Sequence, residues 1–241
     1  MPGIGTIVNI FAVLAGGFIG LLLKGGMKER YQEGVVKAMG LSTIFIGASG
    51  ALPGMLVTDG SSLTGVSIHE TLAMILAMAL GTFLGEVIDF DGKLERLGAW
   101  LKAKATRGED SRFIEGFVTA SLTVCVGAMA IVGSIQDGLI GDPSTLFTKS
   151  ILDFIILIIY ASTYGKGALF SAIPVAILQG GVTVCAGLLS PFFTPPVIAN
   201  LSFLGNMMIF CVGCNLAFQA KFRVANMLPA LIFGALGVTF F

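Results

Sequence analysis

The sequence predicts an all-α polytopic membrane protein with about eight transmembrane helices. Residues 167–220 contain no Asp, Glu, Lys or Arg, and because about 20 apolar residues cross a bilayer core, this stretch is long enough for two spans. Hydrophobic residues make up 55% of the chain and charged residues 12%, against about 25% charged in soluble domains. Glycine accounts for 33 of 241 residues, which is typical of membrane helices that pack closely or break.

The positions of the eight spans follow from apolar runs in the sequence, and the distribution of Lys and Arg among the loops supports this number of spans. The spans lie at about 5–23, 38–57, 69–89, 114–135, 146–165, 167–189, 197–219 and 224–241. If the N-terminus is outside, the inner loops hold all 14 Lys and Arg residues except Lys149. The positive-inside rule therefore predicts that both termini are outside. The first apolar run has no basic n-region and no A-x-A site, so we expect a retained span and no cleaved signal.

The whole chain, 1–241, is predicted to be a single transmembrane domain, with one surface helix at 92–107. Leu94, Leu97 and Leu101 follow the helical period there, and Lys and Arg fill much of the rest. Such a helix lies along cytoplasmic headgroups. The alternative is a helix packed on the floor of the bundle, and either role is structural.

Three hairpins, at about 5–57, 69–135 and 167–219, resemble one another. Gly16-Gly-Phe-Ile-Gly20 matches Gly81-Thr-Phe-Leu-Gly85, and other short blocks recur in the same order. Chance similarity between glycine-rich helices is the alternative explanation. Adding the fifth and eighth spans gives two three-span units that are inverted relative to each other. This 3+3 inverted arrangement is common in secondary transporters, whose substrate site lies at the repeat interface near the midplane.

We expect broken helices near the midplane, because several spans carry helix-breaking residues. They are Gly47, Gly50, Pro53 and Gly54 in the second span, Gly133–Gly138 at the end of the fourth, Pro174 and Gly180-Gly181 in the sixth, and Gly205-Asn206 with Gly213 in the seventh. Unwound backbone at membrane depth is tolerated only where it is buried or lines a wet cavity.

Asp153 is the strongest candidate for a functional residue. It lies within the fifth predicted span and is followed by Phe-Ile-Ile-Leu-Ile-Ile. A charge at this depth costs roughly 2.5–3.5 kcal/mol on insertion scales. Lys149, four residues earlier, is placed to form an i,i+4 salt bridge. The sequence leaves open whether Asp153 binds a substrate or ion, or forms only this structural pair.

Polar side chains in other spans extend the candidate site. Gln179 and Asn206 lie near mid-depth and either bind a solute or ion, or join helices at roughly 0.6 kcal/mol each. Asn9 and Asn215 are further amides in predicted spans. Gln136 and Asp137 lie at the outer mouth of the fourth span. They suit an entrance gate, and equally a helix cap and a loop turn.

The same composition argues against several other classes of function. Net charge is zero, so no nucleic-acid partner is expected. The four Cys residues lie in apolar segments and the chain has one His, so we expect neither a metal site nor a cofactor. Clustered His, Asp and Glu for acid–base chemistry are missing, so no enzyme is predicted.

Several motifs resemble one bacterial family. Residues Gly133–Asp142 (GSIQDGLIGD), Lys149–Phe154 (KSILDF), Ser162–Gly181 and Gly205–Leu216 are similar to the inner-membrane family that includes YqgA and YdfK. The resemblance covers essentially the whole chain. It implies a bacterial cytoplasmic membrane, and a family whose function is unknown and for which transport is only suspected.

The leading hypothesis is a secondary transporter of a small solute, with Asp153 as the residue that would couple it to a proton or sodium ion. An acid with amides suits a cation, a proton-coupled neutral solute or a zwitterion. The alternatives are a structural or regulatory membrane protein, or a small-solute channel. Besides membrane lipids and the solute or ion, we expect a second copy of the chain as partner. The Gly16-x-x-x-Gly20 and Gly81-x-x-x-Gly85 faces favour close helix packing in a homodimer.

Overall fold

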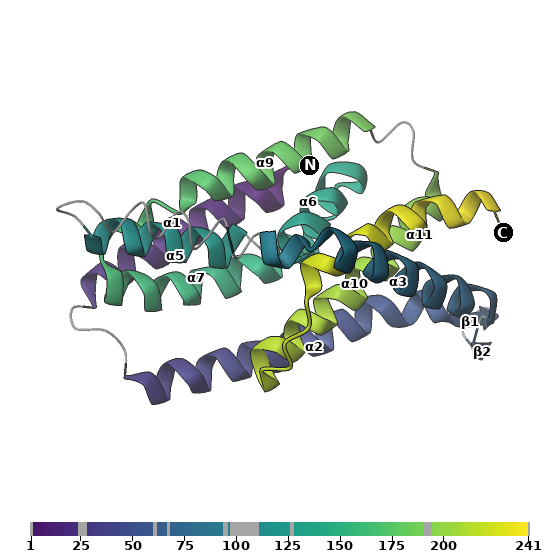
Figure 1. Cartoon of the computed structure of the whole chain (residues 1–241), viewed down its shortest axis with the longest axis horizontal. Helices are drawn as coiled ribbons and strands as arrows, with labels where there is room; N and C mark the ends of the chain where they lie inside the picture. The colour runs from purple at the N-terminus through teal and green to yellow at the C-terminus, as the bar shows by residue number, and fades with distance from the viewer. Residues whose placement is uncertain are drawn as a thin grey trace. The chain divides into compact units, whose positions relative to one another are not determined.

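A computed structural model describes residues 2–23, 28–59, 62–66, 68–93, 96, 111–125, 128–189 and 194–240. They form two compact units: unit 1 comprises Met1–Val36 and Gly92–Ser190, and unit 2 comprises Lys37–Asp91 and Pro191–Phe241. Unit 1 holds helices α1 (Ile4–Leu22), α5 (Ser111–Cys125), α6 (Ala128–Ile140), α7 (Ser144–Tyr164), α8 (Lys166–Leu169) and α9 (Ala172–Leu189) (Figure 1). Unit 2 holds most of α2 (Glu29–Met55), with strands β1 (Leu56–Asp59) and β2 (Ser62–Val66) and helices α3 (Ile68–Ile88), α10 (Pro195–Phe218), η2 (Val224–Met227) and α11 (Pro229–Phe240).

The helices agree with a multi-pass membrane protein. Among the described residues, six are long and apolar enough to span a bilayer, and a seventh span results if the 119–125 and 129–140 helices, bent by 51°, count as one. The predicted eighth span, 224–241, is a short 3₁₀ turn followed by α11, which has 12 residues. At 1.5 Å per residue α11 is about 18 Å long, less than the ~30 Å of a bilayer core. The count of eight is therefore not shown by the described helices.

In unit 1, glycines let α1 and α7 touch backbone to backbone. A Cβ added at Gly16 would lie 2.3 Å from the Phe154 carbonyl oxygen, and one at Gly20 would lie 2.5 Å from that of Ile158. The contacts advance together along both helices, so α1 and α7 are parallel. The Gly16-x-x-x-Gly20 motif thus packs within the subunit, as the small residues of close membrane helices do.

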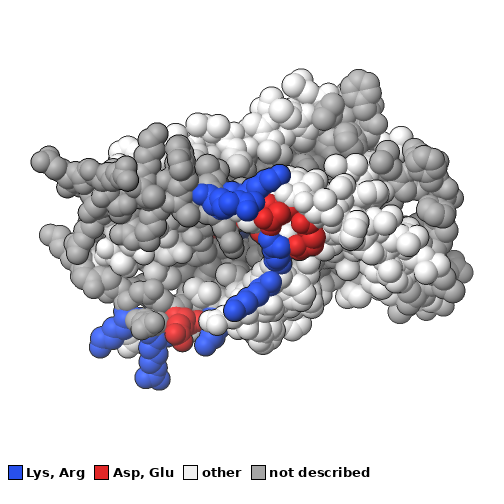
Figure 2. All heavy atoms as spheres, viewed as in Figure 1, with Lys and Arg blue, Asp and Glu red and all other residues white. Residues whose placement is uncertain are grey.

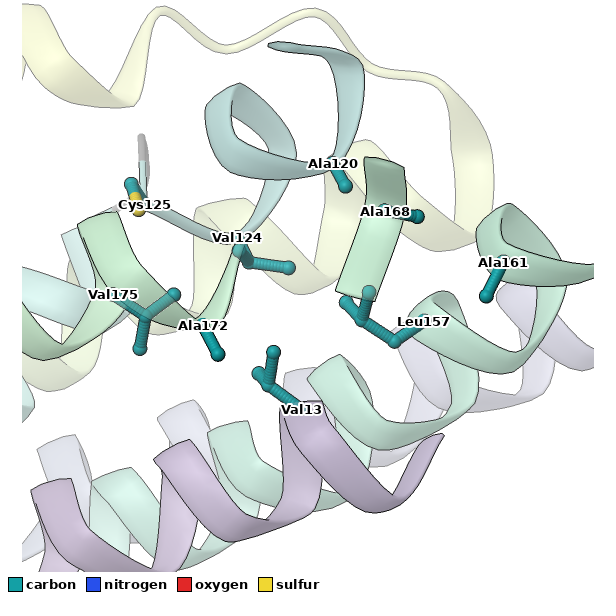
Figure 3. Packing of buried hydrophobic residues seen from close by; sticks show 9 residues of the cluster. All are labelled: Val13, Ala120, Val124, Cys125, Leu157, Ala161, Ala168, Ala172 and Val175. Atoms are coloured by element: carbon teal, nitrogen blue, oxygen red, sulfur yellow. The ribbon is translucent and has the colours of Figure 1, made fainter. Parts of the chain in front are cut away.

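The apolar core of unit 1 brings together α1, α5, α7, α8 and α9. Figure 3 shows its small side chains pointing toward one another, and they are Val13, Ala120, Val124, Cys125, Leu157, Ala161, Ala168, Ala172 and Val175. Their small size keeps the helix axes close. Polar side chains of α1, α7 and α9 are therefore brought within hydrogen-bonding distance of one another.

Unit 2 uses glycine in the same way on two antiparallel helix pairs. A Cβ built on Gly47 of α2 would lie 2.4 Å from the backbone nitrogen of Phe210 in α10. A Cβ built on Gly85 of α3 would lie only 1.8 Å from the Asn226 carbonyl oxygen. Both predicted glycine motifs therefore serve packing inside one chain.

The helices differ from the sequence expectation in where they break. The helices α2, α9 and α10 run without interruption through Pro53, Gly180-Gly181 and Gly205-Asn206. Glycines such as Gly47 remove a side chain at a helix contact and leave the helix intact. Helix α6 likewise runs unbroken through Gly133–Gly138, where a break was predicted. Among the described residues, one interruption falls at Phe170 and Ser171, between α8 and α9.

The predicted repeats stay a prediction, but the units distribute them in a regular way. Each predicted hairpin has one arm in unit 1 and the other in unit 2. The arms in unit 1 are α1, the α5–α6 pair and α9, and those in unit 2 are α2, α3 and α10. The surface helix predicted at 92–107 lies outside the described residues, apart from Gly92, Lys93 and Arg96. An antiparallel hairpin, β1–β2, follows α2 and was not predicted.

Candidate functional site

Four helices of unit 1 carry two levels of buried polar side chains. We call Thr6, Asp137, Lys149 and Thr183 the outer layer, and Asn9, Ser134, Asp153 and Gln179 the inner layer. On each of α1, α6, α7 and α9, the inner residue lies three or four positions from the outer one, which is one helical turn on the same face. All eight side chains are buried.

In the outer layer, the Asp137 carboxylate of α6 caps the N-terminus of α1. Its Oδ1 accepts from the Gly3 N–H at 3.1 Å, and its Oδ2 accepts from the N–H groups of Gly5 and Thr6 at 3.0 and 3.3 Å. The first N–H groups of a helix lack partners inside the helix, and this carboxylate accepts hydrogen bonds from them. Its negative charge is also stabilised by the positive end of the helix dipole. Of the two interpretations left open for Asp137, the geometry is that of a helix cap.

Two further contacts close the outer level. The Thr6 and Thr183 hydroxyls lie 3.0 Å apart and join α1 to α9. The Thr145 hydroxyl donates to the Gln136 amide oxygen at 2.6 Å, so Gln136 links α6 to α7. Gln136 and Asp137 therefore hold helix ends together on the side of the inner layer where α1 begins.

A buried ion pair joins the outer layer to the inner layer. The Lys149 ammonium lies 2.7 Å from both carboxylate oxygens of Asp153, and the two side chains are 7% and 4% exposed. This is the i,i+4 salt bridge that the sequence allowed. In a low-dielectric interior such a pair is favourable only because both charges are matched and hydrogen-bonded.

Two amides from other helices extend this pair. The Asn9 Nδ2 group donates to Asp153 Oδ2 at 2.9 Å and to Gln179 Oε1 at 3.0 Å. The result is a continuous chain of polar contacts from Lys149 and Asp153 on α7, through Asn9 on α1, to Gln179 on α9. Asp153 and Gln179, predicted separately, thus belong to one cluster.

Helix α6 contributes to the same polar region. It supplies Ser134 to the inner layer and Asp137 to the outer layer, and its Gln136 bonds to Thr145 of α7. Among the described residues, no group of three or more His, Cys, Asp or Glu side chains is placed to hold a metal ion.

Asn206 belongs to unit 2, where its Nδ2 donates to the Ser202 carbonyl oxygen at 2.8 Å, one turn earlier in the same helix. Its side chain faces Gly50, where a built Cβ would lie 2.4 Å away. This geometry is that of an amide packed between two helices.

Several charged groups of unit 2 lie together at the end of α3. The Asn215 amide bonds both the N–H and the C=O of Phe222 and holds the turn after α10. Arg223 then pairs with Glu86 and Asp89 at the end of α3, and the hydrogen bond to Asp89 raises the pKa of the exposed guanidinium above its ordinary value. Figure 2 shows red acidic side chains lying directly against blue basic ones.

Sequence reasoning did not identify Thr6, Ser134 and Thr183. Each is a small hydroxyl residue in an apolar helix, where such residues commonly bond their own backbone. The available signal was spacing, because each stands one turn from a stronger polar residue on its helix: Asn9, Asp137 or Gln179.

The comparisons with known proteins identify the family. A family model described as a protein of unknown function (DUF554) matches residues 4–239. The chain belongs to the DUF554 family. It is 30% identical over 236 residues to the uncharacterized protein YqgA of Escherichia coli (strain K12), covering 95% of this chain and 93% of YqgA. It is 28% identical over 228 residues to the uncharacterized membrane protein YdfK of Bacillus subtilis (strain 168), with 95% and 92% covered. No solved structure matches the chain.

Proposed function

We propose that this DUF554 protein is a secondary transporter of a small solute, coupled to a proton or sodium ion through Asp153. The observation that carries the proposal is the Lys149–Asp153 pair. Both residues belong to the apolar helix α7, their side chains are buried, and hydrogen bonds connect the pair through Asn9 to Gln179. Ionisable residues within membrane spans are rare, and they mark substrate or ion pathways.

Energetics favour a functional role for this pair. Burying two charges costs several kcal/mol each, and replacing a buried pair by apolar residues is often neutral or stabilising. A helix contact alone is achieved elsewhere in unit 1 by glycine and alanine, as at Gly16 and Ala161. A charged pair with two amides exceeds what packing needs.

Coupling follows from competition for one carboxylate. Both oxygens of Asp153 accept from Lys149, and one also accepts from Asn9. A proton or sodium ion that reaches Asp153 competes with the Lys149 ammonium. Its arrival therefore weakens the Lys149 bond and alters the contact that runs through Asn9 to Gln179.

The helix directions support the topology that we propose, with inverted repeats and both termini outside an inner membrane. Parallel α1 and α7 and antiparallel α1 and α9 agree with alternate crossing when α5 and α6 form one bent span. In unit 2, the glycine contacts make α2 and α10 antiparallel, and likewise α3 and α11. A broken span beside a charged site is typical of inverted-repeat transporters.

A homodimer remains part of the proposal, on a different surface from the predicted one. Gly16, Gly20, Gly81 and Gly85 pack inside the chain, so they leave no flat glycine face for a partner. The opposite face of α1 exposes Phe11 and Phe18 to lipid or to a second copy. The alternatives of a channel and of a purely structural protein predict passive flux and no flux, respectively.

The test is uptake into proteoliposomes under an imposed proton or sodium gradient. The probes are radiolabelled urea, acetamide, glycerol, the common amino acids and methylamine. We expect at least one to accumulate above its outside concentration, and the Lys149→Met/Asp153→Asn double variant to lose accumulation. Flux that only equilibrates would favour a channel. Absence of flux for every probe would reject transport of these solutes and favour the structural alternative.

A further inference from the structure

The inner layer differs from the outer layer in how well its polar atoms are bonded. The Asp137 carboxylate and the Thr6 and Thr183 hydroxyls of the outer layer all have protein partners. In the inner layer, the buried Asn9 Oδ1, Gln179 Nε2 and Ser134 Oγ atoms have none. The Asn9 and Gln179 atoms belong to one contact between α1 and α9, because Asn9 Nδ2 and Gln179 Oε1 lie 3.0 Å apart, and Ser134 lies on α6, one turn from Asp137.

The chemical identity of these unbonded atoms is fixed by Asp153. An ionised carboxylate only accepts hydrogen bonds, so Asn9 must turn its NH₂ group toward it. The same NH₂ group meets Gln179, which must therefore present its oxygen. The free atoms are consequently an acceptor on Asn9 and a donor on Gln179, and exchanging O and N in either amide would set two like groups against each other.

Leaving such groups unbonded in a buried site is costly. Each unsatisfied buried donor or acceptor has lost its hydrogen bond to water and gained no partner in the protein. A ligand that offers an N–H group to Asn9 Oδ1 and a carbonyl oxygen to Gln179 Nε2 removes two of these costs. The Ser134 hydroxyl donates or accepts, so it complements either side of such a ligand.

Charge balance then selects the class of ligand. Lys149 and Asp153 neutralise each other at 2.7 Å, so the inner layer has no uncompensated charge for an ionic group. A charged ligand would lose its hydration in this buried site without gaining an opposite charge. A neutral planar group with adjacent N–H and C=O matches the three free atoms and adds no charge.

We propose that the inner layer binds a small uncharged solute of the carboxamide or urea type. This inference rests on the proposed transport function for its physiological meaning, and it specifies the substrate class. Asn9 and Gln179 contact the solute directly, and Ser134 supplies a third hydrogen bond. Asp153 acts through Asn9 by fixing which way that amide points.

The experiment is saturation-transfer NMR on the full-length protein in nanodiscs, using solutes matched in shape and different in charge. The probes are acetamide against acetate, and urea against guanidinium. We expect transfer to acetamide and urea and none to their charged counterparts. Gln179→Leu should weaken acetamide binding about tenfold, as expected for the loss of one buried hydrogen bond. Asn206→Ala, in unit 2, should leave it unchanged.

Ser134→Ala provides a second test that does not depend on Gln179→Leu folding. The Ser134 hydroxyl has no protein partner, so its removal breaks no bond within the protein, and we expect weaker acetamide binding with normal folding. Equal transfer to acetate or guanidinium would overturn the proposal. It would also be overturned by no transfer to any probe, which would mean that the Asn9 and Gln179 amides satisfy each other, or by transfer that neither variant reduces.

Binding and transport can fail separately. Acetamide binding without gradient-driven uptake would support this site and reject the transporter function. Gradient-driven uptake of an ionic solute without acetamide binding would do the reverse.

Discussion

Unit 1 and unit 2 share a packing method and differ in what their helices enclose. Both use glycine for backbone contact, as Gly16 does against Phe154 and Gly85 against Asn226. Unit 1 encloses a matched ion pair with amides and hydroxyls at two levels. In unit 2, Asn206 bonds its own helix, and the ion pairs of Arg223 lie exposed at one end. The two units therefore have similar hydropathy and different interiors: that of unit 1 contains a polar cluster, and that of unit 2 is largely apolar.

The largest expected effect comes from removing one charge of the buried pair. Lys149→Met leaves the Asp153 carboxylate with only Asn9 as a partner, and we expect a loss of about 3–5 kcal/mol in the free energy of unfolding. The Lys149→Met/Asp153→Asn double variant should recover most of that loss, because no charge stays buried. Unfolding equilibria in bicelles give both values. A single variant as stable as the parent would mean that the pair is not buried as described.

Replacing a glycine at a helix contact by alanine should destabilise both units to a similar extent. Gly16→Ala and Gly85→Ala would place a Cβ 2.3 and 1.8 Å from a carbonyl oxygen, respectively. We expect each to cost about 1–3 kcal/mol of unfolding free energy, as overpacking does. Gly180→Ala is the matched control, since nothing lies within 4 Å of its built Cβ. A larger loss for Gly180→Ala than for Gly16→Ala would contradict the α1–α7 contact.

A smaller effect is expected at two side chains whose hydrogen bonds hold helix ends, Asp137 at the start of α1 and Asn215 at the end of α10. Asp137→Ala removes three hydrogen bonds from the start of α1, and loss of a helix cap costs about 0.5–2 kcal/mol. Hydrogen exchange should become faster at Gly5 and Thr6. Asn215→Ala is its counterpart in unit 2 and should free the turn at Phe222. Unchanged exchange at both places would argue against these contacts.

The smallest effect is expected at the exposed pairs of unit 2. Arg223 is 46% exposed against Glu86 at 42%, and exposed ion pairs contribute little because water and salt screen them. Arg223→Gln should lower the free energy of unfolding by less than Lys149→Met or Asp137→Ala does, and this difference should shrink in high salt. A loss as large as that of Lys149→Met would remove the contrast between buried and exposed charge.

The sequence predicted the ends of some helices well, where long apolar runs are bounded by polar residues, but α2 begins at Glu29, nine residues before the span predicted at 38–57. The spans predicted at 5–23, 69–89 and 146–165 correspond to α1, α3 and α7, and their ends differ by one or two residues. The breaks were harder to predict, because glycine serves both to unwind a helix and to admit a neighbour. At Gly47 it admits Phe210 of α10, and the helix continues.

Part of the candidate site also followed from the sequence. The Lys149–Asp153 pair is local, so its i,i+4 spacing was enough to suggest it. The bond from Asn9 to Asp153 joins residues 144 positions apart, and no local pattern specifies such a contact. Asn206 and Gln179 looked alike as amides in apolar spans, and only the helix contacts separate them.

The most direct test of the central claim asks whether the inner layer opens to both sides of the membrane. Gln179→Cys is introduced after the native Cys125, Cys185, Cys211 and Cys214 are changed to Ala. A membrane-impermeant thiol reagent is then applied from outside to spheroplasts and from inside to inverted vesicles. A transporter predicts labelling from both sides, and reduced labelling when acetamide is present. Protection from both sides, while an exposed loop cysteine reacts fully, would show a sealed structural core and contradict the transport account.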